Sequence, residues 1–195
     1  MRFKSRHAVL LLGLAGLAAA ALAAGQAARR PGVTPIPSID VPRYMGTWYE
    51  IAKYPNRFQK QCAGSTTASY RLRPDKTVEV VNRCRRADGA FDDVTGTARQ
   101  VGGPDSPILK VRFAPAWLSF LPVVWGDYWV IDLDPDYQLA AVSEPSREYL
   151  WILARTPTVD QRAYAALLER LERQGFDLAK LQPTPQASAN QENSL

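Results

Sequence analysis

Residues 45–54, Met-Gly-Thr-Trp-Tyr-Glu-Ile-Ala-Lys-Tyr, place a glycine two residues before a tryptophan and continue as a run of β-forming residues. The run predicts a strand over residues 47–54, which Pro55-Asn56 would end. A glycine in a strand lets another part of the chain approach the backbone closely. The segment is therefore either an ordinary first strand of a core or the sealed floor of a container.

Seven further segments have the length and residue types of strands, and turn residues separate them. They span residues 66–73, 77–84, 91–101, 108–113, 127–133, 137–142 and 148–154. In residues 108–113, Leu109, Val111 and Phe113 share one face, whereas Lys110 and Arg112 share the other. One apolar and one polar face are what an antiparallel sheet closed around an interior requires.

Eight consecutive strands joined by short turns predict an all-β fold, an eight-stranded antiparallel up-and-down β-barrel. Closing the barrel removes both exposed sheet edges. A barrel of this size either fills with side chains or holds one small ligand. A β-sandwich is the structural alternative, but the run of tight turns favours the meandering barrel.

One segment after the strands has helical spacing of its apolar residues. Thr158 is the expected N-cap, and Gln161 stands three residues later, as in a capping box. Gly175 is expected to end the helix. The sequence therefore predicts one C-terminal α-helix packed outside the barrel.

The N-terminus predicts export. Arg2, Lys4 and Arg6 precede an apolar run over residues 8–24, and small residues follow at possible cleavage sites. An uncleaved membrane anchor is the alternative, although the run is short for a spanning helix. The expected layout is a signal peptide (1–27), a Pro-rich linker (28–42), a barrel domain (43–182) and a disordered tail (183–195).

The charge of the chain excludes one class of partner. Removing the predicted signal peptide leaves 21 basic and 19 acidic side chains, so the net charge falls from +5 to +2. The basic residues are scattered among acidic ones, apart from a short cluster over residues 83–86. A nucleic-acid partner is therefore not expected.

The two cysteines, Cys62 and Cys84, would enter an oxidising compartment if the chain is exported, which predicts one disulfide. Both share the parity of the apolar residues in their strands, and they lie on the side of the hairpin away from its turn. The alternative is a pair of free, buried thiols.

The residues needed for common catalytic sites are scarce. The only histidine, His7, lies in the predicted signal peptide. The remaining chain thus offers no Ser-His-Asp or Cys-His arrangement and no histidine ligand for a metal. Asp132, Asp134 and Asp136 alternate as in a cation-binding loop, but they straddle a predicted turn and lack the rest of such a motif. We expect no catalysis, no metal and no cofactor.

Three motifs resemble those of the lipocalin family, in particular its bacterial Blc-type members, which are close to apolipoprotein D and the plant temperature-induced lipocalins. They are Gly46-Thr47-Trp48, the segment 126–134 around the sixth strand, and the segment 149–157, which contains Arg155. The resemblance runs from about residue 41 to residue 181. Prolines at 183 and 185 stand where the family often has a short ninth strand, which weakens the prediction of that strand.

The resemblance implies a barrel closed at one end that holds a hydrophobic small molecule. At the closed end, Arg155 would pack across the indole of Trp48, and Gly46 would leave room for the close approach. In bacterial members the implied ligand is a fatty acid or lysophospholipid, and the implied role is storage or transport in the envelope. The chain would then lie in the periplasm or at the periplasmic face of the outer membrane. N-terminal lipidation needs a cysteine at the cleavage point, directly after the apolar run. No cysteine stands there, so lipidation is not expected.

Strand directions give the expected places of the site residues. Turns near residues 74, 102 and 134 would lie at the closed end, and loops over 56–61, 85–89, 114–125 and 143–147 at the mouth. The cavity is expected to be lined by Tyr70, Val80, Val111, Phe113, Tyr128, Val130 and Trp151. The mouth is expected to carry Phe58, Trp117, Leu118, Phe120, Leu121 and Trp125.

Several functional alternatives remain open from the sequence. The apolar mouth residues could contact a membrane, plug the mouth, or form a homodimer around a filled barrel. A barrel of this type could also be an enzyme acting on a lipophilic substrate. Such an enzyme would need a convergent ionisable pair inside the barrel, and Glu50 together with another acid in the cavity would favour it. The leading hypothesis is non-catalytic binding of a lipid-like amphiphile.

Overall fold

The computed structural model describes residues 32–186. The predicted signal peptide and residues 187–195 of the predicted tail lie outside the described residues. Within 32–186, no helix combines the length and apolarity needed to cross a membrane.

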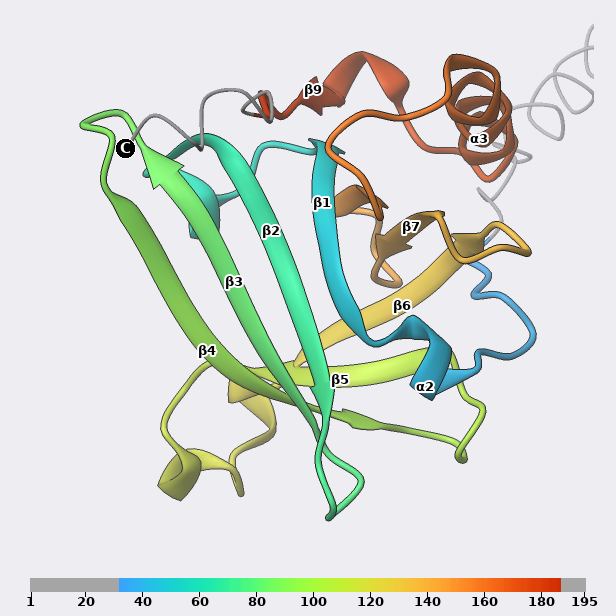
Figure 1. Cartoon of the computed structure of the whole chain (residues 1–195). Helices are drawn as coiled ribbons and strands as arrows, with labels where there is room; N and C mark the ends of the chain where they lie inside the picture. Colours follow the sequence, from blue (N-terminus) through green and yellow to red (C-terminus); the bar gives the residue numbers. More distant parts are fainter. Residues whose placement is uncertain (1–31, 187–195) are drawn as a thin grey trace, which may run out of the picture. The chain divides into compact units, whose positions relative to one another are not determined.

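The described residues form a closed antiparallel barrel (Figure 1). Each strand pairs with the next, and β1 pairs with both β8 and β2, which closes the sheet on itself. The predicted eight-stranded up-and-down barrel is confirmed. The strands are β1 (Gly46–Lys53), β2 (Cys62–Leu72), β3 (Val78–Arg86), β4 (Phe91–Gln100), β5 (Ile108–Arg112), β6 (Gly126–Leu133), β7 (Leu139–Ser143) and β8 (Leu150–Ala154).

Short helices lie before β1, in two of the connections between barrel strands, and after the longer C-terminal helix. They are α2 (Val41–Tyr44), η1 (Arg57–Gln59), η2 (Ala116–Leu118), η3 (Pro122–Val124) and η4 (Leu178–Lys180). The longer helix α3 (Gln161–Arg173) follows the barrel, and a short strand β9 (Gln182–Pro183) follows η4.

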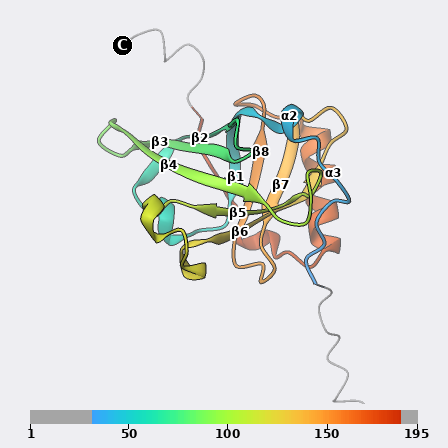
Figure 2. The ribbon, with the colours of Figure 1, turned by 90° about the horizontal axis from the view of Figure 1, so that it is seen from below.

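The helix α3 packs outside the barrel, as predicted (Figures 1 and 2). Its N-cap is Asp160, whose side chain accepts a hydrogen bond from the amide of Ala163, so the prediction of Thr158 was wrong. The helix begins at Gln161, which puts the Asp160 carboxylate within reach of the third helical amide. Gly175, at φ +84°, follows the helix end as predicted.

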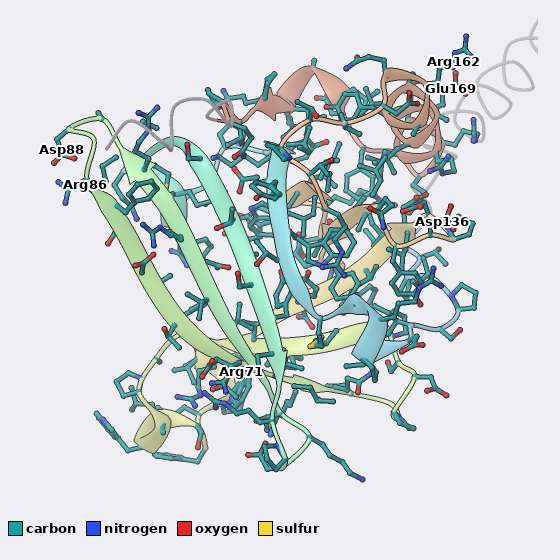
Figure 3. All side chains as sticks on the ribbon, in the orientation of Figure 1. Arg71, Arg86, Asp88, Asp136, Arg162 and Glu169 are labelled. Atoms are coloured by element: carbon teal, nitrogen blue, oxygen red, sulfur yellow. A yellow bond between two sulfur atoms is a disulfide. The ribbon has the colours of Figure 1, made fainter. Side chains whose placement is uncertain are left out.

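The barrel has two apolar clusters, one on each face of β6–β8. Inward residues such as Leu153 pack with Trp48 inside the barrel. Outward residues such as Ile152 pack against Leu167 and Leu171 of α3. The opposite face of the helix carries charged side chains, among them the labelled Arg162 and Glu169 in Figure 3. This arrangement explains why strands on this side are apolar on both faces.

The predicted linker contributes to the fold from Val33 onward. Val33, Ile39 and Val41 are buried. The amide of Ile36 donates to the carbonyl of Val130, and that of Ile39 to the carbonyl of Asp105. The boundary at residue 42 was therefore too late, because a few apolar residues between prolines are enough to pack the segment across the barrel end.

Residues 183–186, which follow the predicted domain boundary, are also part of the fold. The strand β9 pairs with the mouth half of β1, so the prolines do not remove the ninth strand. The amide of Thr184 donates to Ile51, and the carbonyl of Pro185 accepts from Ser65 of β2. A Cβ on Gly64 would lie 2.5 Å from the Pro185 oxygen, so only glycine allows this approach. Residues 182–185 thus fill the gap where β1 and β2 separate.

Candidate functional site

The strand directions define a closed end and a mouth. The strand β1 runs from Gly46 at the closed end to Lys53 at the mouth. In Figure 1, α2 lies at the lower right, while the β3–β4 tip and the loop between β5 and β6 lie on the left. Figure 3 labels Arg86 and Asp88 at that β3–β4 tip, where they form an ion pair.

Trp48 and Arg155 close the floor of the barrel. The Arg155 guanidinium lies 3.9 Å from the indole centroid and donates to the carbonyls of Thr47, Arg43 and Tyr137. Gly46 has φ +97°, and a Cβ there would lie 3.2 Å from the guanidinium. The floor combines cation–π stacking with hydrogen bonds that only a guanidinium can make together.

Three tyrosine hydroxyls meet above this floor. Tyr128 shares one hydrogen bond with Tyr44 and one with Tyr70, both with oxygens 2.9 Å apart. The Tyr44 ring also packs on Trp48, with ring centroids 4.9 Å apart. We call Tyr44, Tyr70 and Tyr128 the tyrosine triad. Sequence reasoning missed Tyr44, because it lies in the short helix α2 and not in a strand.

Burial keeps the triad phenols neutral. Loss of hydration raises the pKa of Tyr70 to about 12 and also raises the pKa values of Tyr44 and Tyr128 well above the usual range of a phenol. The Tyr70 phenol adds to the effect for Tyr44, and the Tyr44 and Tyr70 phenols add to it for Tyr128. The bottom of the barrel is therefore apolar, apart from the uncharged hydroxyls of the tyrosine triad.

The raised pKa values predict alkaline unfolding. The unfolded chain ionises its tyrosines near pH 10, whereas the folded triad keeps its protons. The stabilisation is complete below about pH 10 and is lost as the pH rises toward and past 12. Tyrosinate absorbance followed together with circular dichroism checks this: part of the absorbance should appear only as the fold is lost. Full ionisation with an intact fold would contradict the prediction.

The structure places the predicted cavity residues in two groups. Val80 and Val130 are buried in the interior cluster together with Tyr70. Val111, Tyr128 and Trp151 face the interior but stay partly exposed. The predicted residues therefore do share the interior, but the valines at 80 and 130 support the floor and offer no free surface.

The mouth half of the interior is open. Phe113 lies over the inward-facing Gly96, where a Cβ would be 2.7 Å from the phenyl ring, yet 43% of the Phe113 side chain is exposed. Val94 shares the inward face of β4 with Gly96 and Ala98, and it is 47% exposed. Inward side chains this exposed are reached by solvent from the mouth, and we call the part of the interior that they line the upper chamber.

Glu50 and Lys53 form an ion pair on the inner face of β1, toward the mouth. The Lys53 ammonium lies 2.8 Å from Glu50, and their side chains are only 14% and 3% exposed. Register with β8 shows both facing inward, since Glu50 pairs with Leu153 and Lys53 with Trp151. A bulge between Glu50 and Ala52 brings the two residues to one face.

Neighbouring polar groups complete this ion-pair cluster. Gln59 donates to Glu50 and accepts from the Trp151 indole. The Thr184 hydroxyl donates to Glu50 as well, so the carboxylate has three donors. A partly open cleft of about 320 Å³ adjoins the cluster. Its lining includes Lys53, Asn56, Gln59, Lys60 and residues 182–185.

The predicted mouth residues lie on η1 and on the loop between β5 and β6. Trp117 and Phe120 are 73% and 74% exposed, and Phe58 is also exposed. Leu118 and Leu121 are half-buried. Val123, in the same loop, is 88% exposed.

Trp125 has a different environment from the other mouth aromatics. It is half-buried, and the guanidinium groups of Arg99 and Arg112 lie 4.3 and 5.3 Å from its ring. Arg112 also donates to the carbonyl of Ala114. These arginines face away from the interior, because the alternating Leu109 and Val111 belong to the interior cluster.

Cys62 and Cys84 form a disulfide across β2 and β3, with Cα atoms 5.5 Å apart. It joins the two strands near the mouth, where β2 has left β1. A crosslink over 22 residues contributes about 3 kcal/mol on a chain-entropy estimate.

The inward Glu50 is paired with Lys53, and Gln59 and Thr184 are its further side-chain partners within residues 32–186. Residues 32–186 contain no group of three or more His, Cys, Asp or Glu side chains placed to hold a metal. The described interior thus combines exposed apolar side chains, an ion pair near the mouth and a neutral polar floor.

Comparisons with known proteins agree with this geometry. The profile of the lipocalin-like domain matches residues 39–186. Temperature-induced lipocalin-1 of Arabidopsis thaliana is 42% identical over 161 residues, covering 82% of this chain and 86% of that protein. Outer membrane lipoprotein Blc of Escherichia coli K12 is 40% identical over 150 residues, covering 76% and 80%.

Solved structures show the same architecture. Insecticyanin from the tobacco hornworm Manduca sexta matches with a TM-score of 0.63 and 20% identity, over 82% of this chain and 87% of that one. At this identity the structural match shows the fold alone.

Proposed function

The chain belongs to the lipocalin family, and from this we propose that it stores or transports a fatty acid or lysophospholipid in the bacterial envelope without catalysing a reaction. Lipocalins typically bind small hydrophobic molecules. The observation that carries the proposal is the exposure of inward apolar residues, Phe113 and Val94, above a floor that is fully packed. Such a chamber is shaped to bury an alkyl chain.

The charged head of the ligand would lie near the mouth. Lys53 is the inward cation there, and its ammonium makes one ion pair, with Glu50, so further donors remain for a carboxylate or phosphate. The apolar chain would extend toward the floor. The Glu50 carboxylate is held by Lys53, Gln59 and Thr184, an arrangement that suits a binding wall.

Blocking the chamber should abolish ligand uptake. Phe113→Asp places a charge where the alkyl chain would lie, so we expect the affinity for palmitate or a lysophospholipid to fall by about tenfold or more. Isothermal titration of the delipidated protein measures this, and native mass spectrometry tests whether lipid co-purifies.

Phe91→Asp is the matched control. Phe91 is 44% exposed, like Phe113, but it lies on the outer face of β4, under the guanidinium of Arg83. It should bind ligand as the wild type does. A wild-type protein that neither co-purifies with lipid nor takes up either ligand would contradict the proposed function.

We place the protein in the periplasm, or at the periplasmic face of the outer membrane, without an N-terminal lipid. The relative from Escherichia coli is named an outer membrane lipoprotein. Here the only two cysteines are joined to each other, so neither is free to carry a lipid. Intact-mass measurement of the protein isolated from a cell envelope fraction tests this.

The exposed mouth residues would contact a bilayer surface during ligand exchange. Trp117, Phe120 and Val123 project from one loop, and the basic Arg57 and Lys60 lie on another loop at the same end of the barrel. Apolar tips with basic residues at the same end suit an anionic lipid surface. Trp117→Ser with Phe120→Ser should reduce sedimentation with anionic vesicles by about fivefold or more.

Leu72→Ser serves as the control for the vesicle experiment, because Leu72 is an exposed apolar residue at the closed end. It should leave vesicle binding unchanged. Unchanged binding by the mouth variant would contradict membrane contact, and a concentration-dependent dimer that the mouth variant abolishes would favour a homodimer interface instead.

A further inference from the structure

The tyrosine triad has one hydrogen-bond donor more than its two mutual hydrogen bonds can use. Each of Tyr44, Tyr70 and Tyr128 has one O–H to donate. The three hydroxyls share two hydrogen bonds, and neither contact can use more than one hydrogen. Whichever way the hydrogens point, one O–H is left over. No other partner for these hydroxyls occurs in the part of the chain that the structure describes.

The unused donor can reach the chamber through Tyr128. Tyr44 and Tyr70 are buried, whereas Tyr128 stays partly exposed on the interior face of β6. The inward residues Ala68 and Val111 are partly exposed as well. The surface that the triad presents is therefore the bottom of the open chamber.

The surroundings favour an uncharged partner. The phenols are neutral, and the cluster around them is apolar, with Trp48 and Val130 fully buried. Arg155, the nearby cation, lies across the Trp48 ring and already donates to three carbonyls. A carboxylate at this depth would lose its hydration and gain little, whereas a neutral oxygen needs one donor, and one donor is free.

We propose that the triad binds one uncharged oxygen, a hydroxyl, carbonyl or ether, carried by the inner end of the ligand. This rests on the proposed function, and it makes the preferred ligand an amphiphile oxygenated at both ends: a charged head near Lys53 and a neutral oxygen at the floor. An unsubstituted alkyl end would leave the spare donor unpaired.

The test uses the full protein and two series of probes, unbranched saturated fatty acids and their ω-hydroxy counterparts, over a range of chain lengths. For each length, the ratio of the dissociation constant of the hydroxy acid to that of the parent acid is measured. At the length that reaches the floor, the wild-type ratio should be near one or below. In Tyr128→Phe it should rise by about fivefold or more.

A second variant distinguishes the loss of the hydrogen bond that Tyr128 donates to the ligand from a general disturbance of the barrel floor. Tyr44→Phe with Tyr70→Phe leaves Tyr128 with its O–H free to donate, so the low ratio should persist. A ratio that rises equally in both variants, or changes in neither at any chain length, overturns the proposal. If neither the parent acids nor the hydroxy acids bind the wild type, the proposed function and this proposal both fail. If the parent acids bind and the ratio is the same in all three proteins, only this proposal fails.

Discussion

Replacing Trp48 with alanine should lower the free energy of unfolding by about 3–5 kcal/mol. The side chain is fully buried at the barrel floor. Its ring contacts Tyr44 on one side and the Arg155 guanidinium on the other. The substitution leaves a cavity, removes the cation–π contact and leaves the guanidinium partly without a partner. Urea titration followed by circular dichroism measures the change.

Trp117→Ala is the matched control for Trp48→Ala. It removes the same atoms from a side chain that is 73% exposed, so the stability should stay within about 0.5 kcal/mol. A loss below about 1 kcal/mol for the Trp48 variant would show that the floor relaxes around the missing ring. The stacking of Arg155 on Trp48 would then not be what holds the start of β1 to the segment that follows β8.

The sequence predicts the barrel well because local rules govern it. The alternation of apolar and polar residues, together with the turn residues, locates the strands. The predicted first residues of β2 and β7 are wrong because a crosslink and a turn determine where these strands begin. β7 begins at Leu139 and not at 137, because Tyr137 has φ +59° and belongs to the preceding turn. β2 begins at Cys62 and not at 66, where the chain is joined to β3 by the disulfide.

The candidate site is predicted less completely because contacts distant in sequence build it. Strict alternation cannot put Glu50 and Lys53 on one face, since they are three residues apart, and only the bulge in β1 does so. Thr184 and Gln59 reach Glu50 from segments that carry no strand pattern. Composition likewise suggests that the residues beyond 182 are disordered, whereas a gap between β1 and β2 orders residues 183–186.

Breaking the Glu50–Lys53 pair should have asymmetric effects. Lys53→Met leaves the Glu50 carboxylate, 3% exposed, without its cation, and should cost about 3–5 kcal/mol. Glu50→Gln leaves a lysine that is 14% exposed and can extend toward the mouth, so it should cost less, about 1–3 kcal/mol. Chemical denaturation of the two variants measures the difference.

The double variant decides whether the pair is held for stability or for ligand binding. If Glu50→Gln with Lys53→Met lies within about 1 kcal/mol of the wild type, the ion pair adds little net stability, as is common for buried pairs. Its retention inside the chamber would then be explained by recognition. Palmitate should stabilise Glu50→Gln more than the wild type, because the lysine no longer has a protein anion beside it. Equal stabilisation of both would mean that the ligand head does not meet Lys53, and that the pair serves only to fix the bulged end of β1.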